Sequence, residues 1–425
     1  GYKSMFYLTA TGRNDWESQL AFSEASSFFY PSVGLSGVIS SMARLPEWIS
    51  FLKVRGSYTE VGTSFERFIT RPTYEFNIAS GKWSSTSIYP MRNLKPEKTR
   101  SWEFGLNSKW LDNRLSFDLT YYKSNTINQT FTADLSISSG YSKAYIQSGN
   151  VRNEGIEMAL GYSDKWNGFA WDSHLTLSWN KNKIIKLTEG SINPMTGEPI
   201  TKDNYDMGQL GNLDARVKLY KGGSIGDVYA THRIKRDGNG NVFVSQEGKI
   251  EIESVDEFKL GSILPKTNMG WSNNFSYKGV NLGMTLTARF GGIALSGTQS
   301  VLDQYGVSQV TANYRDTGGV PINHGYVDTE KYFDTVKGYA AYYTYSATNV
   351  RLAELSLSYT LPKEWFRDKL RMTVGLVGKN LWMIYCKAPF DPEATASTQS
   401  NYYQSYDYFM QPTTRNLGFS VKLNF

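Results

Sequence analysis

The sequence predicts an all-β protein that crosses a membrane as an antiparallel β-barrel, and three observations support this fold class. Apolar and polar residues alternate along segments of about ten residues, for example at 115–122, 280–290 and 416–425. The connections between such segments are alternately short and long. Aromatic residues form 15% of the chain, an excess that fits the aromatic girdles of barrels. Because strand side chains point to opposite faces in turn, about 9–11 alternating residues can cross a bilayer.

The alternation predicts twelve strands in order along the chain. They lie at 3–13, 30–40, 51–61, 98–109, 114–124, 153–163, 170–182, 264–277, 280–291, 347–361, 370–381 and 412–425. The short connections are 41–50, 110–113, 164–169, 278–279 and 362–369, and the long ones are 14–29, 62–97, 125–152, 183–263, 292–346 and 382–411. In a barrel this arrangement places the short turns at the periplasmic side and the long loops outside.

Charged residues follow the same two-faced pattern. In the strand interiors most share the polar face: Lys53, Arg55, Glu103, Asp118, Glu157, Arg289, Glu354, Arg371 and Lys422. Those on the apolar face lie near strand ends that adjoin long loops: Glu60, Lys98, Arg100, Lys123, Glu154, Arg351 and Arg415. An Arg or Lys facing lipid at mid-bilayer costs roughly 2–4 kcal/mol, which explains the one-sided placement. We therefore expect lipid contact at Leu119, Leu286 and Phe419, and lumen contact at Thr120, Thr287 and Ser420.

Composition excludes several other classes of protein. The 425 residues contain no apolar run near the roughly 20 residues that a membrane helix needs. A single cysteine, Cys386, excludes an internal disulfide framework. The net charge of +6 is small for this length and the basic residues are scattered, so no nucleic-acid partner is expected.

No catalytic or metal-binding constellation is visible. His174, His232 and His324 are far apart and show no metal-ligand spacing. The segment 237–241, DGNGN, resembles the start of a calcium loop but lacks the later Glu, so a hairpin turn is the preferred interpretation. The segment 261–267 lacks the glycine of a phosphate loop, and pairs such as Asp391 and Glu393 are expected by chance among 39 acidic residues. We expect no enzyme, cofactor or bound metal.

Two long loops are rich in tyrosine, which offers flat contact area together with a polar group. The candidates for cargo contact are Asn401, Tyr402, Tyr403, Gln404, Tyr406, Asp407 and Tyr408, with Phe409 beside them. The candidates for partner contact are Tyr339, Tyr342, Tyr343 and Tyr345. Both clusters are also compatible with a structural role, in an aromatic girdle or in packing between loops.

Seven segments, in order along nearly the whole chain, resemble the SusC/RagA class of TonB-dependent outer-membrane transporters. They are LKVRGSYTEVG at 52–62, LKPEKTRSWEFGLN at 94–107, NVRNEGIEMALGY at 150–162, GSILPKTNMGWSNNFSYKGVNL at 261–282, NVRLAELSLSYTLP at 349–362, LRMTVGLVGKNL at 370–381 with DPE at 391–393, and TTRNLGFSVKLNF at 413–425. The terminal phenylalanine also resembles the assembly signal of outer-membrane barrels.

This resemblance implies the C-terminal part of a 22-stranded barrel in the bacterial outer membrane, with residues 1–425 as one domain. It implies an N-terminal plug, a TonB box and about ten further strands upstream of this chain. It also implies a SusD-like surface lipoprotein as partner, energy supplied through TonB, and oligosaccharide or peptide cargo. Loops 183–263 and 292–346 are then expected to contact the lipoprotein, because loops this long are usually functional.

Two alternatives remain open at this point. A passive porin would show the same alternation without the family segments, and a plug with a TonB box upstream would argue against it. A soluble β-rich adhesin or lectin would show a half-buried sheet, and dependence on detergent would distinguish it from either barrel.

Overall fold

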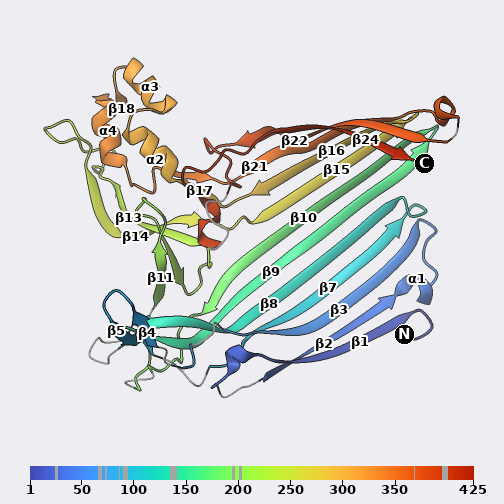
Figure 1. Ribbon diagram of the computed structural model, residues 1–425, viewed down its shortest axis with the longest axis horizontal. Helices are drawn as coiled ribbons and strands as arrows, with labels where there is room; N and C mark the ends of the chain where they lie inside the picture. Colours follow the sequence, from blue (N-terminus) through green and yellow to red (C-terminus); the bar gives the residue numbers. More distant parts are fainter. Residues whose placement is uncertain are drawn as a thin grey trace. The chain divides into compact units, whose positions relative to one another are not determined.

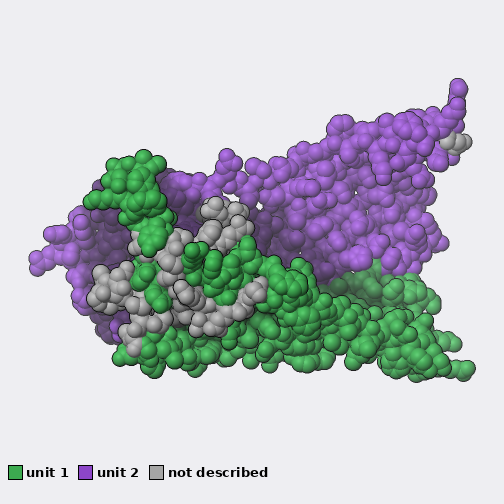
Figure 2. Space-filling model, turned by 60° about the horizontal axis from the view of Figure 1, so that its bottom comes forward, with its two compact units in different colours: residues 1–162, 178–205, 220–224 green, residues 163–177, 206–219, 225–425 purple. Residues whose placement is uncertain are grey.

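The computed structural model describes residues 1–23, 27–65, 69–71, 74–85, 87–89, 94–134, 141–193, 197–200, 203–367, 369–394 and 401–425. The chain forms two compact units (Figure 2). Unit 1 comprises Gly1–Tyr162, Ser178–Tyr205 and Tyr220–Ser224, and unit 2 comprises Ser163–Leu177, Asp206–Leu219 and Ile225–Phe425. Each unit therefore contains long strands together with loops of its own.

Long strands joined as antiparallel neighbours dominate the fold (Figure 1). In sheet order they are β1 (Phe6–Trp16), β2 (Ser27–Val38), β3 (Ile49–Thr63), β7 (Glu97–Trp110), β8 (Leu115–Asp134), β9 (Lys143–Trp166), β10 (Phe169–Lys186), β15 (Thr267–Tyr277), β16 (Val280–Phe290), β21 (Asn349–Thr360), β22 (Arg371–Cys386) and β24 (Asn416–Asn424). These correspond one to one with the twelve predicted strands, which confirms the predicted fold class. Strands β8 and β9 extend furthest beyond their predicted ends, into the expected long loop.

The short turns use the residues that their geometry requires. Lys278 and Gly279 join β15 to β16 with φ of 46° and 86°, and Asn167 and Gly168 join β9 to β10 with φ of 50° and 81°. Two successive positive φ values are typical of the type I′ turn, whose twist matches the twist of the flanking strands. These two of the short connections predicted from the sequence are therefore tight hairpins.

The register within unit 1 confirms the two-faced strands. Val54 lies opposite Leu106, which lies opposite Leu119, and Leu119 lies opposite Met158. The alternate residues form the polar face, where the Arg55 guanidinium donates to Thr120 Oγ1 at 2.6 Å and to Asp118 Oδ1 at 3.1 Å. Hence Leu119 and Thr120 lie on opposite faces, as expected.

The charges predicted on the apolar face near the loops pair with one another. The Glu60 carboxylate lies 2.7 Å from Lys98 Nζ and 3.0 Å from Arg100 Nε. Lys123 lies directly opposite Glu154, whose carboxylate is 3.8 Å from Lys181 Nζ. Pairing and proximity to the loop ends keep these charges out of the apolar band.

The prediction for Arg351 is wrong. Its parity in the sequence places it on the apolar face, but the register between β16 and β21 shifts after Thr285, which pairs with Glu354 while Leu286 pairs with Leu352. One extra residue in β21 is a β-bulge, and it reverses the faces of the residues beyond it. Arg351 therefore lies opposite Thr287, on the polar face.

The long loops of unit 2 contain a folded core that has no continuous pattern in the sequence. A four-stranded sheet comprises β11 (Asn204–Gln209), β12 (Arg216–Tyr220), β13 (Asp227–Ile234) and β14 (Ile252–Ser262). The remaining elements of these loops are β17 (Ile293–Ser296), α2 (Gly297–Gln304), α3 (Gln309–Asp316), β18 (Val320–Ile322), β19 (Gly325–Val327), α4 (Thr329–Val336), β20 (Thr344–Ser346), η4 (Asn401–Ser405) and β23 (Tyr406–Asp407). The short connection between β21 and β22 contains η3 (Lys363–Phe366). Ser296, Ser308 and Asp328 cap the three helices, each accepting a backbone N–H three residues later.

The loops of unit 1 are smaller. They contain η1 (Ser18–Leu20), α1 (Ile39–Met42), the hairpin of β4 (Tyr74–Asn77) and β5 (Lys82–Ser85), and β6 (Ile88–Tyr89), which pairs in parallel with β9. A small core joins loops 14–29 and 62–97 through Leu20, Phe65, Ile69 and Leu94. Within the described part of the chain, no helix is both long enough and apolar enough to cross a membrane.

Candidate functional site

Aromatic rings stack in a continuous row along the segment 403–409 of unit 2. We call Tyr403, Tyr406, Tyr408 and Phe409 the aromatic ladder. Successive ring centroids are 5.9, 6.1 and 5.2 Å apart, in edge, stacked and edge arrangements. These distances and angles are favourable for aromatic pairs. Adjacent polar residues of the predicted cargo cluster are Gln404, which is exposed, and Asp407.

Backbone pairing holds the ladder in place. Strand β23 pairs in parallel with β17, with Tyr406 opposite Leu295 and Asp407 opposite Ser296. The Ser296 hydroxyl donates to Asp407 Oδ2 at 2.6 Å while it caps α2. The Thr298 hydroxyl accepts the Phe409 backbone N–H at 2.6 Å. Two loops far apart in the sequence thus form one structure.

Tyr406 is the buried anchor of the ladder, at 2% exposure. Its hydroxyl donates to Asn212 Oδ1 at 2.5 Å and accepts the Asn212 backbone N–H at 3.1 Å. Gly211, with φ of 56°, and Gly297 lie against the ring, and a Cβ at either position would overlap the Tyr406 hydroxyl. Burial raises the pKa of Tyr406 to about 12, so the hydroxyl stays neutral. These glycines create the space that the tyrosine occupies.

The other end of the ladder is accessible. Tyr408 is 48% exposed and Phe409 is 56% exposed, whereas Tyr403 is partly buried, with its hydroxyl 3.4 Å from the Gln209 carbonyl that it donates to. The side chains of Asn401 and Tyr402, also predicted for cargo contact, lie outside the described residues. The arrangement provides a rigid aromatic surface at Tyr408 and Phe409, which the buried Tyr406 ring holds in place.

The second tyrosine cluster, predicted to contact a partner, lies in the core of the same unit. Tyr343 is 0% exposed and Tyr339 is 8% exposed, and the Tyr339 hydroxyl accepts the Ile234 backbone N–H at 3.1 Å. Tyr342 is half-buried, and so is Tyr345, which packs edge-on against Phe390. In this core Tyr339, Tyr342 and Tyr343 pack with Tyr406, Leu295, Phe333 and residues of the four-stranded sheet. These tyrosines therefore pack within the unit, and their rings are not displayed on its surface for a partner.

An ion pair fastens the start of the loop that carries the ladder. The Arg351 guanidinium donates two hydrogen bonds to the Asp391 carboxylate, at 2.9 and 2.7 Å, and both side chains are largely buried. Glu393 lies 3.5 Å from the same guanidinium. Burial opposes ionisation of Asp391, but the hydrogen bonds from Arg351 and the Glu393 N–H outweigh it and lower the pKa of the carboxyl. The two carboxylates are thus engaged by an arginine, which does not suit acid–base catalysis.

Other polar groups considered from the sequence have structural partners. His232 Nδ1 lies 3.0 Å from Asp214 Oδ2, and His174 Nε2 lies 3.4 Å from Asp172 Oδ1. Asp237 accepts three hydrogen bonds from Asn239 and Asn241, in the turn that the sequence predicts. Among the described residues, no group of three His, Cys, Asp or Glu side chains could hold a metal ion.

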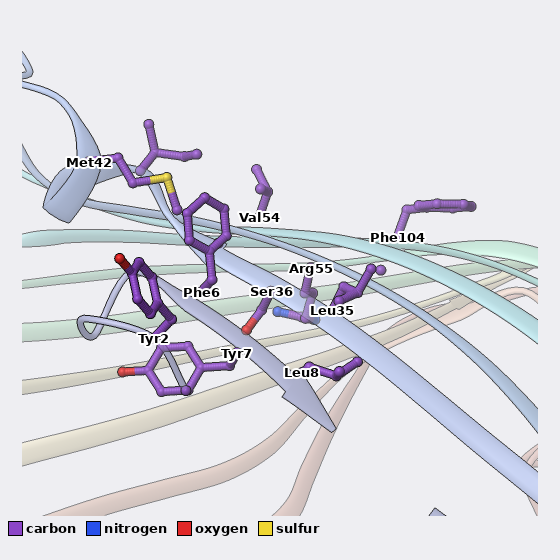
Figure 3. Close-up of a pocket in the computed structure, with 14 residues that line it drawn as sticks. Tyr2, Phe6, Tyr7, Leu8, Leu35, Ser36, Met42, Val54, Arg55 and Phe104 are labelled. Carbon is purple, nitrogen blue, oxygen red and sulfur yellow. The ribbon is translucent and has the colours of Figure 1, made fainter. Parts of the chain in front are cut away.

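A hollow of about 650 Å³ in unit 1 has an apolar lining (Figure 3). Phe6, Leu8, Leu35, Val54 and Phe104 contribute side chains from one face of β1, β2, β3 and β7. This is the face that carries Leu119, which we assign to lipid. The hollow therefore belongs to the membrane-facing surface, and its lining is mostly apolar, although Tyr2, Tyr7, Ser36 and Arg55 also border it.

Comparison with known proteins explains the fold. The family model described as TonB dependent receptor-like, beta-barrel matches residues 3–381. The chain belongs to this family. The family consists of outer-membrane transporters and receptors rather than enzymes, so the protein is an outer-membrane barrel protein and the soluble adhesin alternative is excluded.

Individual relatives are consistent with this family assignment. The chain is 25% identical to TonB-dependent receptor P3 of Formosa agariphila over 100% of its own length and 44% of that protein. It is 22% identical to TonB-dependent receptor SusC of Bacteroides thetaiotaomicron over 73% of its own length and 31% of SusC. The structure of the RagAB peptide importer in the open-open state shares the fold, with a TM-score of 0.78 and 18% identity over 100% of this chain and 46% of that chain. The chain thus spans less than half the length of these relatives.

Proposed function

We propose that the protein imports oligosaccharides across the outer membrane, with energy supplied through TonB and with a SusD-like surface lipoprotein as partner. The observation that carries the proposal is the aromatic ladder, which presents Tyr408 and Phe409 at the surface of a loop structure. Flat aromatic surface with adjacent polar groups is suited to stacking on sugar rings. Membership of the family supports a role in transport, and the similarity to SusC supports placing this protein in the SusC class of transporters. In this proposal residues 1–425 are the C-terminal part of the barrel, and a plug and further strands belong to the same protein.

The test is the affinity of the intact protein for cargo after the exposed end of the ladder is removed. The variant is Tyr408→Ala with Phe409→Ala, and each lost stacking contact is expected to cost about 1 kcal/mol. Together they predict about 30-fold weaker binding of a neutral oligosaccharide mixture. Tyr74→Ala is the matched control, because Tyr74 is a 66% exposed tyrosine on β4 and is not a member of the ladder. Unchanged affinity at normal barrel levels would assign the ladder to loop packing alone.

Peptide cargo is the second candidate, since the RagAB structure is named a peptide importer. Tyrosine-rich surfaces also bind peptides. The same ladder variant distinguishes the two cargoes when oligosaccharides and a peptide mixture are offered separately. Our proposal predicts that the unaltered protein binds the oligosaccharides and that the loss is confined to them.

The lipoprotein contact is proposed at exposed apolar residues of the same unit rather than at the buried tyrosines. Tyr305 is 72% exposed, Val307 68%, Tyr326 65% and Val310 41%. They lie between α2 and α3, at the start of α3, and on β19. Apolar side chains exposed together on a folded surface often mark a protein contact. We expect Val307→Asp with Val310→Asp to reduce co-purification of the lipoprotein while the barrel assembles normally, and undiminished co-purification would exclude this surface.

A further inference from the structure

Six small polar residues without charge lie directly opposite one another across six neighbouring strands of unit 1. We call them the polar row. The pairs follow from the register between β1 and β2, β2 and β3, β3 and β7, β7 and β8, and β8 and β9. In that order the row consists of Thr11, Ser32, Thr59, Ser101, Ser124 and Asn153. None of the six is buried.

The polar row lies on the lumen face. Thr59 follows Arg55 by four residues on β3, and Ser124 follows Asp118 by six on β8, so all of them share one side of the sheet. Arg55 and Asp118 form the ion pair of the polar face, opposite the apolar face that carries Leu119. The hydroxyls of the row therefore point toward the water-filled side of the barrel.

One hydrogen bond joins two members of the row, and others connect its last member to β10. The Ser32 and Thr59 hydroxyls are 3.1 Å apart. Asn153 Oδ1 accepts from Asn182 Nδ2 at 2.9 Å and from Asn180 Nδ2 at 3.4 Å, and the Tyr122 hydroxyl donates to Asn180 Oδ1 at 2.9 Å. A serine or threonine hydroxyl offers one donor and two acceptor positions, so one bond to a neighbour leaves capacity for a ligand.

The depth of the row places it near the outer mouth of the barrel. Its members are flanked, on the opposite face of the same strands, by the charges Glu60, Arg100, Lys123 and Glu154. Charges on the outward face mark the end of the apolar band, and these lie toward the long loops. The charged lumen groups Arg55 and Asp118 lie nearer the short turns. Toward the loops the same face carries Arg13 and Asp15, which pair with each other at 2.6 Å, and Glu97, which accepts the Thr130 backbone N–H at 3.0 Å. The row is thus a neutral band between charged groups that are engaged with the protein itself.

We propose that the polar row binds an extended, uncharged, hydroxyl-rich oligomer as it enters the barrel, and that it favours such cargo over charged oligomers. Six strands spaced by about 4.8 Å give a row about 24 Å long, which suits an extended chain rather than a compact small molecule. The row contains donors and acceptors but no charge to pair with an ionised ligand. This assignment rests on the proposed import function and adds a second contact surface to the aromatic ladder.

The test compares the intact protein with the variant Thr59→Val, Ser101→Ala and Ser124→Ala, which removes three hydroxyls with little change of shape. The matched control is Thr360→Val with Thr373→Val, a hydroxyl pair 3.0 Å apart where β21 and β22 meet a short turn. The probes are a neutral glucan oligomer mixture and a polyanionic oligogalacturonate mixture.

We expect the row variant to bind the neutral oligomers at least tenfold more weakly and the control to remain within twofold of the unaltered protein. Equal affinity of variant and unaltered protein for the neutral oligomers, at normal barrel levels, would overturn the assignment and leave the import function standing. An equal loss in the control would overturn it too. Binding of peptides but of neither oligosaccharide by the unaltered protein would overturn the proposed cargo and the row together.

Discussion

A charge placed on one face of β24 should destabilise the barrel, and the same charge on the adjacent residue should not. Phe419 lies opposite Leu376 and is 75% exposed on the apolar face, while Ser420 lies opposite Gly375 on the polar face. β24 spans 9 residues. At about 3.4 Å per residue and a tilt of about 40° it covers about 23 Å, close to the apolar band of about 25 Å. Phe419 is one residue from the strand centre and thus about 3 Å from the midplane.

Phe419→Arg should therefore cost close to the full midplane penalty, about 2–4 kcal/mol, or a factor of roughly 30 to 1,000 in the folding equilibrium. Ser420→Arg should cost less than about 1 kcal/mol, because the lumen is hydrated. Phe419→Leu is the matched control for loss of the ring. The assay is denaturant unfolding of the intact protein in bilayers, with heat modifiability on gels as a second readout. Equal losses for the two arginine variants would refute the assignment of faces.

Other predictions concern the loop structure of unit 2. Arg351→Met should cost about 3–5 kcal/mol and expose loop 387–415 to proteases, because it leaves the buried Asp391 carboxylate without its cation; equal protease resistance would contradict this. The pKa of Asp391 is lower in the folded protein than the 3.8 of the unfolded chain, so the ionised carboxylate stabilises the fold above that pH. This stability is lost as the pH falls through the folded pKa, and the unaltered protein in acid should then be cleaved in the same loop as the Arg351→Met variant. Burial raises the pKa of Asp303, so its protonated form stabilises the fold at low pH and this contribution is lost as the pH rises through the folded pKa; Asp303→Asn should remove that dependence from a melting-temperature series. Gly211→Ala should destabilise the unit by at least about 1 kcal/mol more than Gly240→Ala, because Gly240 also has a positive φ but has no atom within 4 Å of an added Cβ. Similar unfolding midpoints for the two variants would contradict the close packing of Gly211 against Tyr406.

The sequence determines the strands because alternation is a local property. Each strand was predicted from residues that are alternately apolar and polar. In a bilayer, a polar residue on the lipid-facing side of a strand costs free energy of folding. Positions such as Leu119 and Phe419 could therefore be assigned to a face without coordinates. The short connections 164–169 and 278–279 were similarly visible as gaps between alternating segments, and the structure places tight turns in them at Asn167–Gly168 and Lys278–Gly279.

Features that depend on distant contacts could not be predicted in this way. The bulge in β21 reverses the face of Arg351, and only pairing with β16 reveals it. The cores of the loops join segments about 190 residues apart, such as Asn212 and Tyr406, without a continuous pattern. Tyrosines that looked like surface candidates, above all Tyr343, proved to be core residues. The glycines at 211 and 297, next to a tyrosine far away in the sequence, had no local signal.

The central claim is active import through the outer membrane, and uptake of a labelled neutral oligosaccharide mixture tests it most directly. Cells would carry the intact protein, with TonB either present or removed and with equal amounts of the barrel in the outer membrane. We predict uptake that requires both the protein and TonB. Uptake that continues at the same rate without TonB would contradict active import and indicate a passive pore.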